Sequence, residues 1–261
     1  MNIENPIIEL RRVNKSFGAQ RVLDDIDLRV ERGRTTVIIG RSGTGKSVLL
    51  KHIVGLLKPD RGEVYYEGRR IDALTERQLT PVRRQISFVF QLNALFDSMT
   101  VGENVAFPMT ENSESRPDRA RIRELTQRSL KIVGLSSFEN KRPSELSGGE
   151  KKRVALARAI TMDPPPKVIL YDEPTAGLDP QRSDVINKLI RSLQDEFHVT
   201  GIVVTHDMKL AIDVGDRVLM LHQGRFIADS PPAELAQDRN EIVRNFVAGI
   251  ADESELATLV R

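Results

Sequence analysis

The chain has 261 residues, of which 39% are hydrophobic and 29% charged, so it is long and apolar enough to bury a core. Its 39 Lys and Arg residues nearly balance 37 Asp and Glu residues, and the net charge of +2 gives no bulk attraction to nucleic acid or anionic lipid. The absence of Cys excludes disulfides, thiolate metal sites and thiol catalysis.

The beginning of the chain, MNIENPIIEL, lacks the basic and apolar segments of a secretory signal. The apolar runs, such as 37–39 and 168–171, have the length of strands, whereas about 20 apolar residues are needed to cross a bilayer. We therefore expect a cytoplasmic protein, and any membrane step that it serves requires another chain.

The first part of the chain alternates between apolar and polar residues over 8–13 and 22–30, which predicts antiparallel strands with one solvated face. Thr35–Ile39 is a β-branched run typical of a strand buried on both faces. A helix is predicted over 47–57 and ends before Pro59, because proline disfavours the helical conformation of the residue before it.

The rest of the chain predicts an α/β core with a mostly parallel sheet, an antiparallel β flank and an inserted helical subdomain. The insertion is expected at about 92–165, where helices and loops replace the alternation. The other expected elements are strands over 62–67 and 86–90, helices over 119–133 and 182–196, strands over 168–171 and 201–204, and a hairpin of 218–221 with 226–228.

One loop matches the phosphate-binding pattern G-x-x-x-x-G-K-[ST] in full, between a predicted buried strand and a predicted helix. Backbone N–H groups of such a loop converge on phosphate oxygens, and the helix dipole adds to the attraction. We expect Lys46 to bind the β- and γ-phosphates of ATP and the Ser47 hydroxyl to ligate Mg²⁺. The loop consists of Gly40, Arg41, Ser42, Gly43, Thr44, Gly45, Lys46 and Ser47.

Two acids follow the apolar run 168–171, at the end of a strand where parallel sheets bind their ligands. Asp172 is the predicted partner of Mg²⁺. Glu173 is the predicted general base that orients and activates the attacking water. Together with the loop, these acids predict a nucleoside triphosphatase.

The segment Leu146-Ser147-Gly148-Gly149-Glu150 carries a more specific signal, because it resembles the signature sequence of ABC ATPases. The resemblance covers residues 7–249 and implies a P-loop NTPase with an ABC-type nucleotide-binding domain and a RecA-like core. It also implies a homodimer in which the signature of one copy, Ser147, Gly148 and Gly149, caps the γ-phosphate held by the other.

Four further residues fall where ABC ATPases have functional positions. The resemblance implies that Gln91 serves the Mg²⁺ and the attacking water, and that His206 contacts the γ-phosphate. Asp179 is expected at the dimer seam, and Phe17 takes the place of a tyrosine that stacks on adenine.

Three shorter segments are similar to the MlaF-like ATPase subunits of Mla phospholipid transporters. They are Phe90–Phe96, Glu103–Pro108 and Phe246–Asp252. This resemblance implies an MlaE-like permease, a small regulatory subunit, a lipid-binding MCE-type protein and a place on the cytoplasmic face of the inner membrane. Residues 92–107 are the predicted docking surface for the permease, unless their apolar residues are core.

The domain boundaries that follow are an ATPase domain over 5–247 and a short tail over 248–261. Two alternatives stay open: an ATPase of another importer or exporter, and a non-transport motor such as a cell-division ATPase. A pure interaction protein with an inactive nucleotide site is disfavoured because Lys46, Asp172, Glu173 and His206 are all present. Nucleic acid is not an expected partner.

Overall fold

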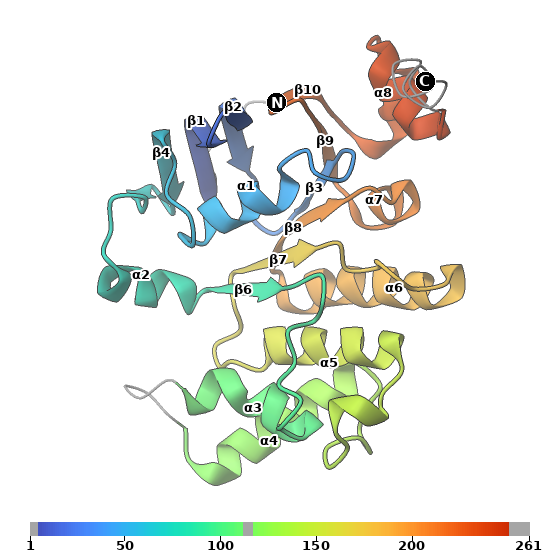
Figure 1. The fold of residues 1–261 in the computed structure, drawn as a ribbon. Helices are drawn as coiled ribbons and strands as arrows, with labels where there is room; N and C mark the ends of the chain where they lie inside the picture. Colours follow the sequence, from blue (N-terminus) through green and yellow to red (C-terminus); the bar gives the residue numbers. More distant parts are fainter. Residues whose placement is uncertain (1–4, 112–116, 251–261) are drawn as a thin grey trace. The chain divides into compact units, whose positions relative to one another are not determined.

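The computed structural model describes residues 5–111 and 117–250, and the chain divides into two compact units. The first unit comprises Met1–Leu79 and Ile202–Arg261, and the second comprises Thr80–Gly201. Figure 1 follows the elements in chain order from blue to red. The predicted helical insertion, 92–165, falls within the second unit.

An antiparallel sheet forms the beginning of the first unit, as the alternating sequence predicts. Its strand order is β2-β1-β4-β5, and Ile8 pairs with both Val30 and Tyr66. The apolar residues of β2 are buried at alternating positions, so one face of the sheet lies on a core. The strands are β1 (Ile8–Phe17), β2 (Gln20–Val30), β4 (Arg61–Tyr66) and β5 (Arg69–Arg70).

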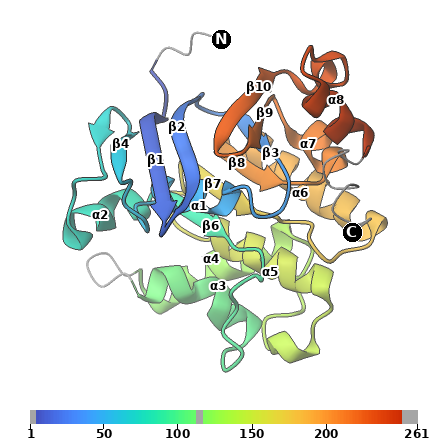
Figure 2. The ribbon, with the colours of Figure 1, turned by 45° about the horizontal axis from the view of Figure 1, so that its top comes forward.

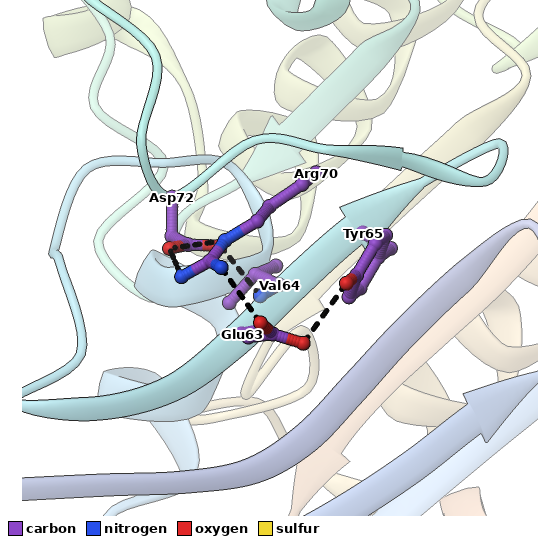
Figure 3. Close-up of polar contacts among 5 residues, drawn as sticks. All are labelled: Glu63, Val64, Tyr65, Arg70 and Asp72. Carbon is purple, nitrogen blue, oxygen red and sulfur yellow. Dashed lines mark hydrogen bonds and ion pairs between the residues drawn. The ribbon is translucent and has the colours of Figure 1, made fainter.

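A polar cluster fastens the turn from β4 to β5 (Figure 3). Arg70 binds Glu63 at 2.6 Å and Asp72 at 2.9 Å, and Asp72 also accepts the Val64 N–H at 2.8 Å. Burial alone would raise the pKa of Asp72, but the hydrogen bonds from Arg70 and Val64 outweigh burial and lower it. The cluster fixes the end of this sheet.

The second sheet of the first unit has the strand order β10-β9-β3-β8. β3 (Thr35–Ile39) is buried along its whole length and runs parallel to β9 (Arg217–His222). The predicted hairpin is confirmed by β9 and β10 (Arg225–Ser230), which are antiparallel. β8 (Thr200–Thr205) begins in the second unit and continues into the first.

Helix α1 (Lys46–Ile53) ends earlier than predicted. Gly55 adopts a φ of 69°, its N–H donates to the His52 carbonyl at 3.0 Å, and the Leu56 N–H donates to the Lys51 carbonyl at 2.8 Å. These bonds form a Schellman motif, which ends the helix before Pro59 can act. Four elements in the described part of this unit were not predicted: β5, α7 (Met208–Val214), the 3₁₀ segment η2 (Pro232–Gln237) and α8 (Glu241–Ala248).

The second unit has a parallel strand pair and a group of helices. β6 (Ile86–Val89) pairs with β7 (Val168–Asp172), and both were predicted. α3, α4 and α5 pack together in both views (Figures 1 and 2) around a core of Ala106, Met109 and Leu125. The helical segments are α2 (Glu76–Arg83, which begins in the first unit), α3 (Val101–Thr110), α4 (Arg119–Ile132), η1 (Pro143–Glu145), α5 (Gly148–Ile160) and α6 (Pro180–Phe197).

Throughout residues 5–111 and 117–250, the helices are too short or too polar to span a membrane. Part of the predicted tail, residues 251–261, lies outside the described residues.

Candidate functional site

The phosphate loop, Gly40–Ser47, connects the buried strand β3 to helix α1. Two of its glycines have no room for a side chain. A Cβ at Gly40 would lie 2.5 Å from the carbonyl oxygen of Leu221, and one at Gly45 would lie 2.7 Å from Cγ1 of Val22. Gly45 also has a φ of 101°, which residues with a Cβ rarely adopt. The path of the loop therefore depends on these two glycines.

Helix α1 begins without a side-chain cap, because its N-cap residue is Gly45. Most other helix N-termini of this protein do have a side-chain acceptor, and those of α3, α5 and α6 are capped by Thr100, Ser147 and Asp179. An anion placed at the start of α1 meets backbone N–H groups and the positive end of the helix dipole. This terminus has the construction of a phosphate site.

Lys46 places its ammonium over the loop. The residue is only 6% exposed, and its Nζ donates to the carbonyls of Gly40 at 2.7 Å and Arg41 at 2.9 Å. Thr44 Oγ1 donates to the same Arg41 carbonyl at 2.9 Å. Burying an ammonium is costly unless hydrogen bonds satisfy it, so these contacts hold the charge at the position that the motif assigns to it.

The other predicted residues of the first unit are His206 and Phe17, and both are exposed. The turn that carries His206 is fixed on both sides, since Asp207 donates to Thr205 Oγ1 at 3.0 Å and caps α7 by accepting from the Lys209 N–H at 2.9 Å. Phe17 ends β1 and is 49% exposed, and Lys15 Nζ lies 5.5 Å from its ring centroid. The ring thus presents a face for stacking.

The two predicted acids lie at the C-terminal end of β7 in the second unit. Asp172 is 7% exposed and Glu173 is 8% exposed. Glu173 has a φ of 46°, in the left-handed region that costs a residue with a Cβ about 1–3 kcal/mol. Its carbonyl accepts from the Ala176 N–H at 3.1 Å, which closes a turn after the strand. The backbone strain is located at the residue predicted to act as the base.

Lys152 on α5 joins two of the predicted positions, and the sequence did not single it out. Its Nζ donates to the carbonyl of Gln91 at 2.6 Å and to the carbonyl of Glu173 at 3.4 Å. The side chain of Lys152 is buried, whereas Gln91 is exposed. A lysine on a helix gives no sequence signal for such a role, because most helical lysines face solvent.

The signature segment begins α5 with a capping box. The Glu150 N–H donates to Ser147 Oγ at 3.4 Å, and the Ser147 N–H donates to Glu150 Oε2 at 2.7 Å. Hydrogen bonds from the hydroxyl and the N–H of Ser147 lower the pKa of Glu150. This helix N-terminus is therefore capped by its own residues and carries a carboxylate.

Asp179 lies beside the signature within the second unit. It caps α6 by accepting from the Arg182 N–H at 2.9 Å. A Cβ at Gly149 would lie 3.5 Å from Cδ of Arg182, which is ordinary contact. A pocket of about 230 Å³ opens at this place, lined by Ser147, Gly149, Glu150, Arg153, Arg182, Val185 and Ile186. The structure brings the signature and the Asp179 turn together, as it does Gln91 and Glu173.

The residues predicted for Mg²⁺ are Ser47, Gln91 and Asp172. In the described part of the chain, no group of three or more His, Asp or Glu side chains could hold a metal ion. Mg²⁺ in nucleotide enzymes uses one or two protein ligands together with phosphate oxygens and water. Each unit offers an oxygen ligand of this kind, the hydroxyl of Ser47 in the first and the buried carboxylate of Asp172 in the second.

The predicted docking segment, 92–107, is partly surface and partly core. Leu92 is 87% exposed and Phe96 is 40% exposed, whereas Val101 is fully buried. Asn104 holds the segment against α3, since its side chain accepts from the Phe96 N–H at 2.8 Å and donates to the Thr100 carbonyl at 2.9 Å. The exposed apolar residues precede the helix, and Val101 belongs to the core.

Comparisons with known proteins agree with the ABC-type motifs of this chain. Residues 23–176 match a family model described as ABC transporter. The chloroplastic protein trigalactosyldiacylglycerol 3 from Arabidopsis thaliana is 42% identical, over 96% of this chain and 76% of the relative. A probable ribonucleotide transport ATP-binding protein, mkl, from Mycobacterium leprae is 38% identical, over 93% of this chain and 69% of the relative.

A solved structure is similar to most of this chain. The ATP-binding cassette MJ0796, a dimer in a post-hydrolysis state bound to ADP and Pi, is 34% identical and superimposes with a TM-score of 0.78. The match covers 86% of this chain and 98% of that cassette.

Proposed function

The chain belongs to the ABC transporter family of ATP-hydrolysing proteins, and we propose that it powers a separate membrane permease that moves phospholipid. The observation that carries the ATPase part is the phosphate loop, where two sterically required glycines and the buried Lys46 form an uncapped helix N-terminus. Hydrolysis of ATP at such a site is the energy source for work done by a partner protein.

The proposed chemistry assigns one task to each group. Lys46 and the N–H groups at the start of α1 bind the β- and γ-phosphates. Ser47, Gln91 and Asp172 would hold Mg²⁺, which would supply positive charge to neutralise the phosphates. Glu173 orients a water and accepts its proton as the oxygen attacks the γ-phosphorus, and Gln91 contacts the same water. The bond from that phosphorus to the bridging oxygen breaks, which gives ADP and phosphate. His206 contacts the γ-phosphate, and Phe17 stacks on the adenine.

We further propose that the active form is a homodimer with twofold symmetry. Ser147, Gly148 and Gly149 of one copy then contact the γ-phosphate bound by the other, and Asp179 lies at the seam. The contact of the signature with the Asp179 turn supports this idea, because both would face the second copy together. The dimeric state of the MJ0796 cassette supports it as well.

The proposal of phospholipid as cargo rests on the similarity to Mla ATPase segments and on a relative that is named for a glycerolipid. The permease would be MlaE-like and would hold this chain at the cytoplasmic face of an inner membrane, with a small regulatory subunit and an MCE-type lipid-binding protein as further partners. The exposed Leu92 and Phe96 are apolar groups that a permease helix can cover.

A reconstituted system tests this function. The tagged chain is purified with the membrane protein that accompanies it and placed in vesicles that contain a fluorescent phospholipid. We expect ATP-dependent transfer of the phospholipid to an acceptor, and no transfer with Glu173→Gln. ATP-dependent accumulation of a ribonucleotide without phospholipid transfer would contradict the cargo but leave the ATPase role intact. ATP hydrolysis without any effect of a permease would contradict the transport role.

A further inference from the structure

Helix α5 sends two long cationic side chains to the segment that follows β6. Lys152 Nζ reaches the Gln91 carbonyl at 2.6 Å. Six residues further along α5, Arg158 Nη2 reaches the Asn93 carbonyl and Nη1 the Ala94 carbonyl, each at 2.6 Å. Two points of α5, in its first half and near its C-terminal end, are thereby bound to the backbone of Gln91, Asn93 and Ala94.

These cations bind carbonyls at strained places in the chain. Asn93, Ala94 and Glu173 are non-glycine residues with φ angles of 64°, 47° and 46°. Arg158 binds the first two of their carbonyls, and Lys152 binds that of Glu173 at 3.4 Å. A left-handed conformation at a residue with a Cβ persists only when the surroundings favour it over the alternatives. Here the favourable contacts come from α5.

The position of Lys152 gives it an electrostatic role in addition. The residue is 4% exposed, and burial lowers the pKa of its ammonium, although the charges of Asp172 and Glu173 partly offset this effect. The charge of this buried cation is thus partly compensated by two nearby carboxylates. Packing alone would not require an ammonium group that contacts two carbonyls beside two carboxylates.

We propose that Lys152 is a positioning residue for Glu173. Its ammonium holds the left-handed backbone of Glu173 and joins it to the carbonyl of Gln91, so that the signature helix, the Gln91 segment and the base keep a fixed mutual geometry. A displacement of α5 when the second copy binds would then move the backbone of Glu173 through the side chain of Lys152. The inference rests on the proposed role of Glu173 in hydrolysis.

The test uses the full chain in its transport complex and compares kcat, KM for ATP and Tm. Lys152→Met keeps the length and apolar stem but has no N–H donor, and Lys152→Arg keeps donors and charge. We expect Lys152→Met to lower kcat by about 10- to 100-fold, with KM within about twofold, because positioning acts on the transition state and not on ATP binding. Lys152→Arg should recover most of the rate.

Lys151→Met is the matched control, because it removes the neighbouring lysine of the same helix, and we expect an unchanged kcat. If Lys152→Met does not fold, Lys152→Gln serves in its place, since it is shorter and cannot join both carbonyls. A lower Tm with the kcat of the folded protein unchanged would overturn the proposal. An equal loss of kcat in Lys151→Met would also overturn it.

A double-variant cycle separates this proposal from the role of Glu173 itself. If Lys152 acts through Glu173, then Lys152→Met should lower the residual single-turnover rate of Glu173→Gln by less than about twofold. Additive losses would show that Lys152 acts by another route. Normal turnover in Glu173→Gln alone would contradict the base assignment, whereas a dead Glu173→Gln with a fully active Lys152→Met would contradict only the inference.

Discussion

Two helices of this protein begin with glycine-rich segments that are proposed to meet phosphate, and they are built differently. α1 begins at Gly45 with no side-chain cap and places the buried Lys46 over the loop. α5 begins at Ser147 with a complete capping box, in which Glu150 supplies a carboxylate. The first terminus is suited to hold a bound anion, whereas the second is capped by its own residues and, in the proposed dimer, meets an anion that the other copy binds.

The difference predicts that α1 sets the affinity for ATP and α5 sets the rate of hydrolysis. A nucleotide bound by one chain alone needs Lys46 but not Ser147. Turnover needs both termini, one from each copy, if the site is shared. The predictions below separate these two effects, and they are arranged from the largest change to the smallest.

Ser147→Arg should lower turnover by about 100-fold or more, because it removes the capping hydroxyl and puts a long side chain where the second copy is proposed to bind. The affinity of the single chain for ATP should stay within about twofold. Steady-state hydrolysis and equilibrium binding of a fluorescent ATP analogue measure the two effects. Wild-type turnover in this variant would contradict the shared site.

Mixing this variant with Lys46→Ala provides a stricter test. Each homodimer is inactive, yet a mixed dimer contains one site with an intact loop and an intact signature. With random exchange and independent sites, the mixture should recover about a quarter of wild-type activity, since half of the dimers are mixed and each has one intact site. An absence of any recovery despite proven exchange would argue that each site lies within one chain.

Lys46→Ala should weaken ATP binding by about 10- to 100-fold, which corresponds to the loss of a charge-assisted contact with phosphate. The Gly40 carbonyl would also lose the donor Lys46, and the Arg41 carbonyl would keep Thr44 but lose Lys46, so a lower Tm is expected in the absence of nucleotide. Isothermal titration with ATP and Mg²⁺ measures the affinity. Unchanged affinity would contradict the assignment of the loop.

Alanine at the two glycine segments should have opposite effects on stability. Gly45→Ala brings a Cβ to 2.7 Å from Val22 at a φ of 101°, so we expect a loss of about 1–3 kcal/mol in the free energy of unfolding. Gly149→Ala fits, because its Cβ would lie 3.5 Å from the flexible Arg182 and alanine favours a helix. Its free energy of unfolding should be unchanged or up to about 1 kcal/mol higher, while turnover falls.

Urea denaturation of both variants measures this comparison. Equal destabilisation by the two substitutions would show that α5, like α1, has a backbone that depends on glycine. The glycines of both segments would then be required for the same reason, namely a backbone that does not accept a Cβ.

How far the sequence predicts this molecule depends on how local the determining contacts are. The phosphate loop was predicted in place because all of its residues are contiguous, and the buried strand and helix on either side of it have clear patterns. The end of α1 was predicted wrongly because the Schellman motif at Gly55 ends the helix several residues before Pro59. The family was confirmed by the comparisons, while the roles of the site residues stay predictions.

The contacts of Lys152 could not be predicted, because they join residues 61 and 21 positions away in the sequence. The left-handed backbone of Glu173 has no sequence signal either, since such conformations are usually marked by Gly or Asn. Helices α2 and α7 were missed for a different reason. α2 has Pro81 inside it, and α7 has seven residues, which is too short for a periodic pattern.

The smallest predicted effect concerns Glu150, whose charge opposes an anion at the start of α5. Glu150→Gln keeps the capping box but removes the carboxylate charge, so ATP-dependent dimerisation should tighten by about two- to fivefold, and less at high salt. The helix loses a favourable charge at its positive end, and the cost should be below about 1 kcal/mol at pH 7 because Glu150 is partly exposed to solvent.

The pH dependence of this cost follows from the lowered pKa of Glu150. Its folded pKa lies below the ordinary value of 4.5, so its contribution to stability is present above 4.5 and is lost as the pH falls through the lower folded value. The difference in unfolding free energy between wild type and Glu150→Gln should therefore shrink as the pH is lowered through this range.

The predicted change in dimerisation is measured separately, by light scattering with ATP in a Glu173→Gln background, where dimers form without turnover. Weaker dimerisation of Glu150→Gln would show that the carboxylate supports the shared site and does not oppose it, and the contrast between the two helix termini would then lie in the cap alone.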